Sequence, residues 1–228
     1  MCRWSLIVDL HLKGNLVIVV GSGNEGLKKV NSLLTQDCKI LVISESSNSQ
    51  IKKFVKNGLI QFKELKLGNA NFLSKYKPYL VMATTTDKIL NKKIVEKAKK
   101  MKSYAYASDD PEISDFAHPS VINIQNTVQI AISTGGSSPA MAKKIKSKAE
   151  TFFQKNISKY DINQIKLQKF ARGMAKQKLS TPLDRKKFLY SIMNDKRVKE
   201  LLKDEKYKIA QTQVKKILRE WPWKKILS

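Results

Sequence analysis

The chain of 228 residues contains few of the side chains that bind transition metals or form disulfides. It has two cysteines, Cys2 and Cys38, and two histidines, His11 and His118. Two cysteines are too few for a disulfide framework or a structural zinc site. No apolar run approaches the roughly 20 residues that cross a bilayer, and the first residues lack a signal-peptide cleavage pattern. These absences predict a cytoplasmic protein with no membrane partner and no protein-bound metal.

Acidic residues are also scarce compared with basic ones. Lysine and arginine together number 44 against 19 aspartates and glutamates, which gives a formal net charge of +25. The excess is largest in residues 151–228, where 21 basic residues stand against 7 acidic ones. Such a balance favours anionic partners, namely nucleic acid, an acidic membrane surface or a ligand with several carboxylates or phosphates.

Short apolar runs alternate with helical patterns in the first half of the chain. This alternation predicts an α/β fold in which a parallel sheet carries helices on both faces. The expected strands are residues 15–20, 39–44, 59–65, 79–84 and 103–107, and the expected helices are 26–34, 49–58 and 88–101.

The pattern changes after residue 112. Residues 120–133 contain two alternating segments with a turn near Asn126, which indicates an antiparallel hairpin. Helical patterns follow, and Ser138 and Thr181 each precede a proline in the arrangement typical of a helix start. The expected domains are a nucleotide-binding domain at 1–112, a hairpin and helix dimerisation segment at 113–150, and a basic helical domain at 151–228.

A glycine pattern marks the junction of the first expected strand and helix. Gly21, Gly23 and Gly26 have the G-x-G-x-x-G spacing of a Rossmann-like dinucleotide site. Glu45, just after the second strand, would bind ribose hydroxyls and so favours NAD over NADP as cofactor. The residues expected to bind the cofactor are Gly21, Ser22, Gly23, Asn24, Glu25, Gly26, Ser44, Glu45, Thr84 and Thr85.

Three motifs in order, VVGSGNEGLKKV, ATTTDKILNKKI and SDDPEISDFAHPSVI, precede the segment VQIAISTGGSSPAMAKKIKSK. Together they resemble the siroheme synthase family, in its precorrin-2 dehydrogenase and sirohydrochlorin ferrochelatase portion. The expected fold is a Rossmann-like parallel sheet followed by a β-hairpin dimerisation segment and a small basic helical domain. We also expect a homodimer, because a long basic helical unit cannot easily bury its apolar stripe on one small sheet alone. The resemblance implies NAD-dependent oxidation of precorrin-2 to sirohydrochlorin, with ferrous iron inserted afterwards in some members. The chain ends where bifunctional relatives continue, so we expect no methyltransferase activity in it.

The resemblance also assigns site residues. Asp109, two residues before Pro111, corresponds to the catalytic acid of the family, and Asp110 is then only its neighbour. Tyr106 stands where the family usually has asparagine. The residues expected to bind the substrate are Thr134, Gly135, Gly136, Ser137, Ser138 and Lys143.

Each assignment has a structural alternative. Asp109 is otherwise a turn residue before proline, Asp87 is expected to cap a helix, and a lone loop histidine such as His118 is more often structural. Two other functions compete with the enzyme, namely a non-enzymatic NAD-binding regulatory domain and a basic nucleic-acid-binding protein. The aromatic residues of the basic segment occur at helical positions and indicate core or tail packing, so we expect no nucleic acid partner. These residues are Phe152, Phe153, Phe170, Phe188, Trp221 and Trp223.

Overall fold

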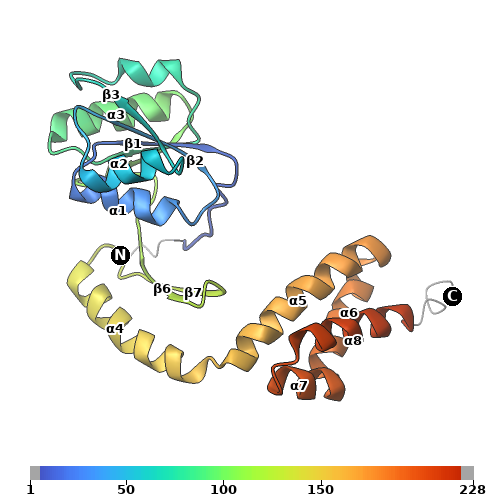
Figure 1. Ribbon diagram of the computed structural model, residues 1–228. Helices are drawn as coiled ribbons and strands as arrows, with labels where there is room; N and C mark the ends of the chain where they lie inside the picture. The colour runs from blue at the N-terminus through green and yellow to red at the C-terminus, as the bar shows by residue number, and fades with distance from the viewer. Residues whose placement is uncertain (1–5, 222–228) are drawn as a thin grey trace. The chain divides into compact units, whose positions relative to one another are not determined.

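The computed structural model describes residues 6–221, and its first part is an α/β sheet (Figure 1). Its elements are β1 (Leu16–Val20), α1 (Asn24–Leu33), β2 (Lys39–Ser44), α2 (Ser49–Lys56), β3 (Gln61–Glu64), η1 (Asn71–Lys75), β4 (Leu80–Ala83), α3 (Lys88–Lys100) and β5 (Tyr104–Ala107). The strand order is β3-β2-β1-β4-β5, and every neighbouring pair is parallel. The order in which strands are added to the sheet therefore changes direction between β1 and β4. In this fold class, ligands bind at that point, at the carboxyl ends of the strands.

Alternate residues of the central strands pack on opposite faces of this sheet. Val17 and Val19 belong to the apolar cluster that contains residues of α1 and α2. Ile18 and Val20 belong to the cluster that contains residues of α3 and η1. Both faces are covered, so the strands are continuous apolar runs. The predicted parallel sheet with helices on both faces is confirmed.

The second part begins with a hairpin and continues as helices (Figure 1). Its elements are β6 (Ser120–Ile124), β7 (Val128–Ile132), α4 (Pro139–Asn156), α5 (Lys159–Lys178), α6 (Pro182–Asn194), α7 (Lys196–Lys203) and α8 (Tyr207–Arg219). β6 and β7 pair antiparallel, and Gln125 and Asn126 between them have φ of 48° and 50°. The predicted hairpin and its turn near Asn126 are confirmed.

The helix starts follow the predicted chemistry. The hydroxyls of Ser138 and Thr181 accept hydrogen bonds from backbone N–H groups in the first turns of α4 and α6, each of which has proline at its start. Asp87 likewise caps α3, where its carboxylate accepts the N–H of Leu90. Such caps satisfy backbone donors that a helix leaves without partners at its start.

The helices α5 to α8 enclose a core of their own. Phe188 is fully buried there, and the Trp221 ring contacts it edge-on with ring centroids 5.3 Å apart. Trp223 lies outside the described residues. The prediction that Phe152 is a core residue is wrong, because its side chain is 59% exposed. Helix α4 packs one face on the hairpin and directs Phe152 away from that contact, whereas Phe153 joins the hairpin cluster.

The described chain divides into two compact units. One contains the residues up to His118 together with Gly135–Ser137, and the other contains Pro119–Thr134 and the residues from Ser138 onward. The three-part division expected from the sequence stays a prediction. Between residues 6 and 221, no helix is both long and apolar enough to cross a membrane.

Candidate active site

The glycine turn between β1 and α1 places backbone groups close together. Gly21 has φ of 104°, and a Cβ there would lie 2.9 Å from the carbonyl oxygen of Thr84. A Cβ on Gly26 would lie 2.1 Å from the carbonyl oxygen of Gly21. Gly23 is different, because a Cβ there would meet nothing within 4 Å, and Gly23 begins α1 without a side-chain cap. Gly21 and Gly26 therefore serve the fold, and Gly23 leaves open space at the helix start.

The hydroxyl groups around this turn are engaged within the protein. The buried Thr84 hydroxyl donates to the carbonyl oxygens of Val20 and Gly21, at 2.9 and 3.2 Å. The Ser22 hydroxyl donates to the hydroxyl of Ser44 at 3.1 Å and to the carbonyl oxygen of Ser46 at 2.6 Å. These bonds fix the turn to the loops that follow β2 and β4. Direct cofactor contacts by Ser22, Ser44 and Thr84 stay predictions.

The loop after β2 carries the acid expected to bind ribose. Glu45 is exposed, and one carboxylate oxygen accepts the backbone N–H of Leu67 at 2.9 Å. A carboxylate has further acceptor positions, so this bond orients Glu45 and leaves capacity for a ligand hydroxyl. Asn48 caps α2 with its side-chain oxygen, and its amide nitrogen donates to the carbonyl oxygen of Ser22 at 2.7 Å. Asn48 thus connects this loop to the glycine turn.

Asp109 is held by a buried amide in α3. Asn91 is completely buried, and its nitrogen donates to the Asp109 carboxylate at 2.7 Å and to the Thr85 carbonyl oxygen at 3.0 Å. Its oxygen accepts the hydroxyl of Thr85 at 2.7 Å and the N–H of Thr85 at 3.2 Å. Asn91 therefore connects the end of β4 to Asp109, the second residue after β5. Asp109 itself remains exposed, as a proton acceptor for a ligand needs to be.

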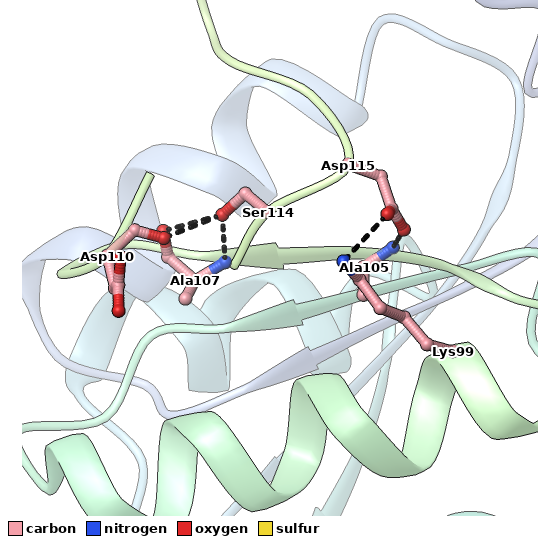
Figure 2. Close-up of polar contacts among 6 residues, drawn as sticks. All are labelled: Lys99, Ala105, Ala107, Asp110, Ser114 and Asp115. Atoms are coloured by element: carbon pink, nitrogen blue, oxygen red, sulfur yellow. Dashed lines mark hydrogen bonds and ion pairs between the residues drawn. The ribbon is translucent and has the colours of Figure 1, made fainter. Parts of the chain in front are cut away.

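The loop beyond Asp109 folds back onto the open edge of β5, as Figure 2 shows. The Ser114 hydroxyl accepts the N–H of Ala107 at 2.9 Å and donates to the carbonyl oxygen of Asp110 at 2.9 Å. The Asp115 carboxylate accepts the N–H of Ala105 at 2.8 Å and pairs with Lys99 at 3.0 Å. An unpaired strand edge is thereby satisfied by side chains. The same bonds fix the loop that carries Asp109.

An aromatic cluster lies on the α1 face of the sheet, just before Asp109. The Tyr106 ring contacts Phe116 and His118, with centroids 5.5 and 4.8 Å away, and the Lys29 ammonium lies 4.3 Å from the Tyr106 centroid. Loss of hydration, followed by the charge of Lys29, lowers the pKa of His118 to about 4. Loss of hydration also raises the pKa of Tyr106, with further contributions from the charges of Glu25 and Asp109. Tyr106 and His118 are therefore neutral near pH 7.

The residues expected to bind substrate lie before and within α4. Thr134 and Ser138 exchange two hydrogen bonds of 3.2 Å, in which the Thr134 hydroxyl accepts the N–H of Ser138 and donates to its carbonyl oxygen. Gly135 and Gly136 between them have φ of 60° and 84°. Ser137 and Lys143 are exposed. Within residues 6–221, no group of three or more His, Cys, Asp or Glu side chains is placed to hold a metal ion.

Sequence reasoning missed Asn91 and Asn48. Asn91 occupies the same helix face as Ile94, Val95 and Ala98, which are all buried. A polar residue within an apolar stripe of a helix indicates a buried side chain that needs hydrogen-bond partners, and this pattern could have identified Asn91. The second bond of Asn48, to Ser22, connects loops far apart in sequence, and no local pattern indicates it.

Family models and curated relatives match most of the chain. Residues 8–120 match the model described as "Putative NAD(P)-binding", and residues 125–148 match the model described as "Sirohaem biosynthesis protein central". The siroheme synthase of Actinobacillus succinogenes is 28% identical over 208 residues, which are 91% of this chain and 42% of that protein. The chain belongs to the siroheme synthase family. The siroheme synthase of Neisseria meningitidis serogroup C, another relative, is 25% identical over 212 residues, 92% of this chain and 42% of that protein.

A solved structure supports the fold of this family member. The protein named "SirC, precorrin-2 dehydrogenase" superposes with a TM-score of 0.65 at 18% identity, and the match covers 95% of this chain and all of that one. The chain spans about two fifths of the length of the curated siroheme synthases it matches.

The lowered pKa of His118 predicts an acid-sensitive first unit. In the unfolded chain, His118 is protonated below its ordinary pKa of 6.5, whereas in the folded protein it is protonated only below about pH 4. The unfolded state therefore binds more protons between these pH values, so the stability of the folded protein falls as the pH falls from about 6.5 to about 4. The loss from about pH 7 to about pH 5 is expected to be about 1 kcal/mol, because the exposed part of the ring stays hydrated. Hydrogen exchange of the backbone amides of β4 and β5 at several pH values measures this loss of stability. His118→Gln should remove this pH dependence, whereas His11→Gln should retain it; equal pH dependence in all three proteins would contradict the assignment.

Proposed function

We propose that this protein oxidises precorrin-2 to sirohydrochlorin with NAD, in siroheme biosynthesis. The observation that carries the proposal is the bond from Asn91 to Asp109, which sets a carboxylate beside the loop after β4. That loop packs on the glycine turn through Thr84. The proposed cofactor turn and the proposed catalytic acid therefore belong to one hydrogen-bonded edge of the sheet.

The residues present fit a dinucleotide. A pyrophosphate binds where a glycine turn leaves room for it close to the backbone. It also needs backbone N–H groups at the start of a helix that no side chain already binds. Gly23 supplies the space, and α1 begins without a side-chain cap. Glu45 would accept ribose hydroxyls and would repel the additional phosphate of NADP, so NAD is the proposed cofactor. Asn24 and Glu25 lie in the first turn of α1, where only their backbone N–H groups suit an anion.

The oxidation removes a hydride and a proton from the substrate. NAD held at the glycine turn would supply the acceptor for the hydride. Asp109 accepts the proton that the substrate loses as the hydride leaves, a role that contributes about 10² to 10⁴-fold in enzymes. Asn91 donates to the Asp109 carboxylate and so keeps it oriented during the transfer. The neutral Tyr106 and His118 place no competing charge beside Asp109.

The proposed substrate carries many carboxylates, which suits a chain with a net charge of +25. Cationic surroundings lower the cost of gathering those charges and raise the encounter rate. Polar groups of Thr134, Gly135, Gly136, Ser137 and Ser138 lie directly before α4, and the Lys143 ammonium group lies within it. We propose that these groups bind substrate carboxylates.

Asp109→Asn tests the proton acceptor. Asparagine keeps an oxygen for the bond from Asn91 but cannot accept the proton, so kcat with precorrin-2 should fall by about 100-fold or more. Anaerobic assays of NADH formation and sirohydrochlorin absorbance measure it. Asp110→Asn is the matched control, because its oxygen still accepts the N–H of Glu112, and its rate should stay within about threefold of wild type. Equal losses in both variants would remove Asp109 from the proposed role.

Gly23→Val tests the position of the pyrophosphate. The site is open and the backbone φ is −68°, so valine fits the free protein and fills the space proposed for the phosphates. The Kd for NAD should rise about 10-fold or more, with thermal stability nearly unchanged. Fluorescence titration with NADH measures the affinity. Gly68→Val, also at an open site in the same unit, is the control; an unchanged Kd for Gly23→Val would refute the placement.

We also propose that the protein forms a homodimer through the hairpin and α4. This segment exposes several large apolar side chains, and a two-stranded sheet alone is marginally stable. A second copy would cover both features, as a two-fold interface does. The exposed apolar residues are Val121, Met141, Ile145 and Phe152.

Phe152→Lys tests this interface. A charge in a buried apolar contact is unfavourable, so the variant should be monomeric at micromolar concentration where wild type is dimeric. Light scattering during size-exclusion chromatography measures the mass. Tyr190→Lys on α6 is the control, since that side chain is also exposed and lies outside the proposed interface. A monomeric wild type would contradict the proposal.

A further inference from the structure

The ammonium group of Lys29 is held over an aromatic ring in the first unit. It lies 4.3 Å from the centroid of Tyr106, which is a closer approach than Lys63 makes to Tyr76 at 5.8 Å. A cation is attracted to the face of a tyrosine ring, so this contact fixes the direction of the Lys29 side chain. Lys29 is therefore a positioned charge rather than a freely moving surface lysine.

This charge has no ion-pair partner. In the described part of the chain, no carboxylate lies within ion-pair distance of Lys29, and the nearby Glu25 is instead paired with Lys28. The Lys29 ammonium is half-buried, and the loss of hydration lowers its pKa, an effect that Glu25 opposes and Lys28 reinforces. A half-buried cation without a counter-charge is a favourable place for an anion to bind.

The position of Lys29 connects it to the proposed reaction centre. Tyr106, beneath the ammonium group, precedes Asp109 by three residues. Loss of hydration raises the pKa of Tyr106, and the charges of Glu25 and then Asp109 add to this effect. Phe116 and His118 complete the surroundings and are neutral near pH 7. Lys29 is therefore connected to Asp109 through Tyr106, three residues earlier in the chain, and an anion at Lys29 meets a single unpaired positive charge.

We propose that Lys29 binds a carboxylate substituent of the tetrapyrrole and so fixes which part of the macrocycle faces Asp109. The proposal rests on the proposed function for the identity of the ligand. An ammonium group suits this task, because its three N–H groups can donate to carboxylate oxygens from several directions. The Tyr106 ring supports the lysine stem and thus acts as a positioning residue.

The phosphates of the cofactor are the alternative anions that could bind Lys29. They are proposed at the first turn of α1, next to Gly23, whereas Lys29 lies six residues later, about 9 Å along the helix axis. Lys29 is also directed toward β5 by its contact with Tyr106. The geometry therefore favours the substrate carboxylate over the pyrophosphate.

The test measures binding of uroporphyrin, a stable tetrapyrrole with a carboxylate on every substituent, to the full chain by fluorescence titration. Lys29→Met removes the charge and keeps the apolar stem, and its Kd should rise about 10-fold relative to wild type. Lys29→Arg keeps the charge and should stay within about threefold. Lys28→Met removes an equal charge one residue away and should also stay within about threefold. Lys29→Gln is measured in parallel, so that a folding defect in one variant still leaves a result.

Titration of each variant with NADH separates the two anion sources. The Kd for NADH should stay within about twofold in all variants. Equal losses in the Lys28 and Lys29 variants, a loss confined to NADH, or failure of wild type to bind uroporphyrin would each overturn the inference. If wild type binds uroporphyrin through Lys29 but does not oxidise precorrin-2, the proposed function fails and the carboxylate site stands.

Discussion

A single buried amide organises the candidate active site. Asn91 forms four hydrogen bonds, three to Thr85 after β4 and one to Asp109 after β5. Breaking one of these hydrogen bonds would leave a polar group of the fully buried Asn91 amide without a partner, which costs free energy. This cost keeps Thr85 and Asp109 in place. The position of the Asp109 carboxylate is therefore set by a buried residue of α3, although Asp109 itself is exposed.

The remaining contacts extend this constraint across the sheet. Thr84 fixes the glycine turn to the end of β4, and Ser114 and Asp115 fix the returning loop to the edge of β5. Most hydroxyls around the turn bond to the protein, which leaves backbone N–H groups and exposed carboxylates for ligands. This division indicates how a loop-built site is ordered: hydroxyl groups bonded within the protein hold the backbone and carboxylate groups that we propose to bind ligands.

The sequence predicts the scaffold well because the scaffold depends on local patterns. The glycine spacing, the strand and helix alternation, the hairpin turn and the proline-led helix starts all follow from residues close together in the chain. The inward direction of the Ser22 and Thr84 hydroxyls does not, because their partners lie across the sheet edge. Phe152 shows the same limit, since helical periodicity identifies an apolar residue but does not say which face of α4 is covered.

We propose that Asn91 holds Asp109 where it meets a tetrapyrrole, and that the tetrapyrrole faces a dinucleotide on the glycine turn. An anaerobic crystal structure with NAD and sirohydrochlorin tests it most directly. We expect phosphates at Gly23, the Asn91 bond intact, and a carboxylate oxygen of Asp109 about 3 Å from the macrocycle. A macrocycle bound away from the ends of β4 and β5, with Asp109 in contact only with solvent, would contradict it.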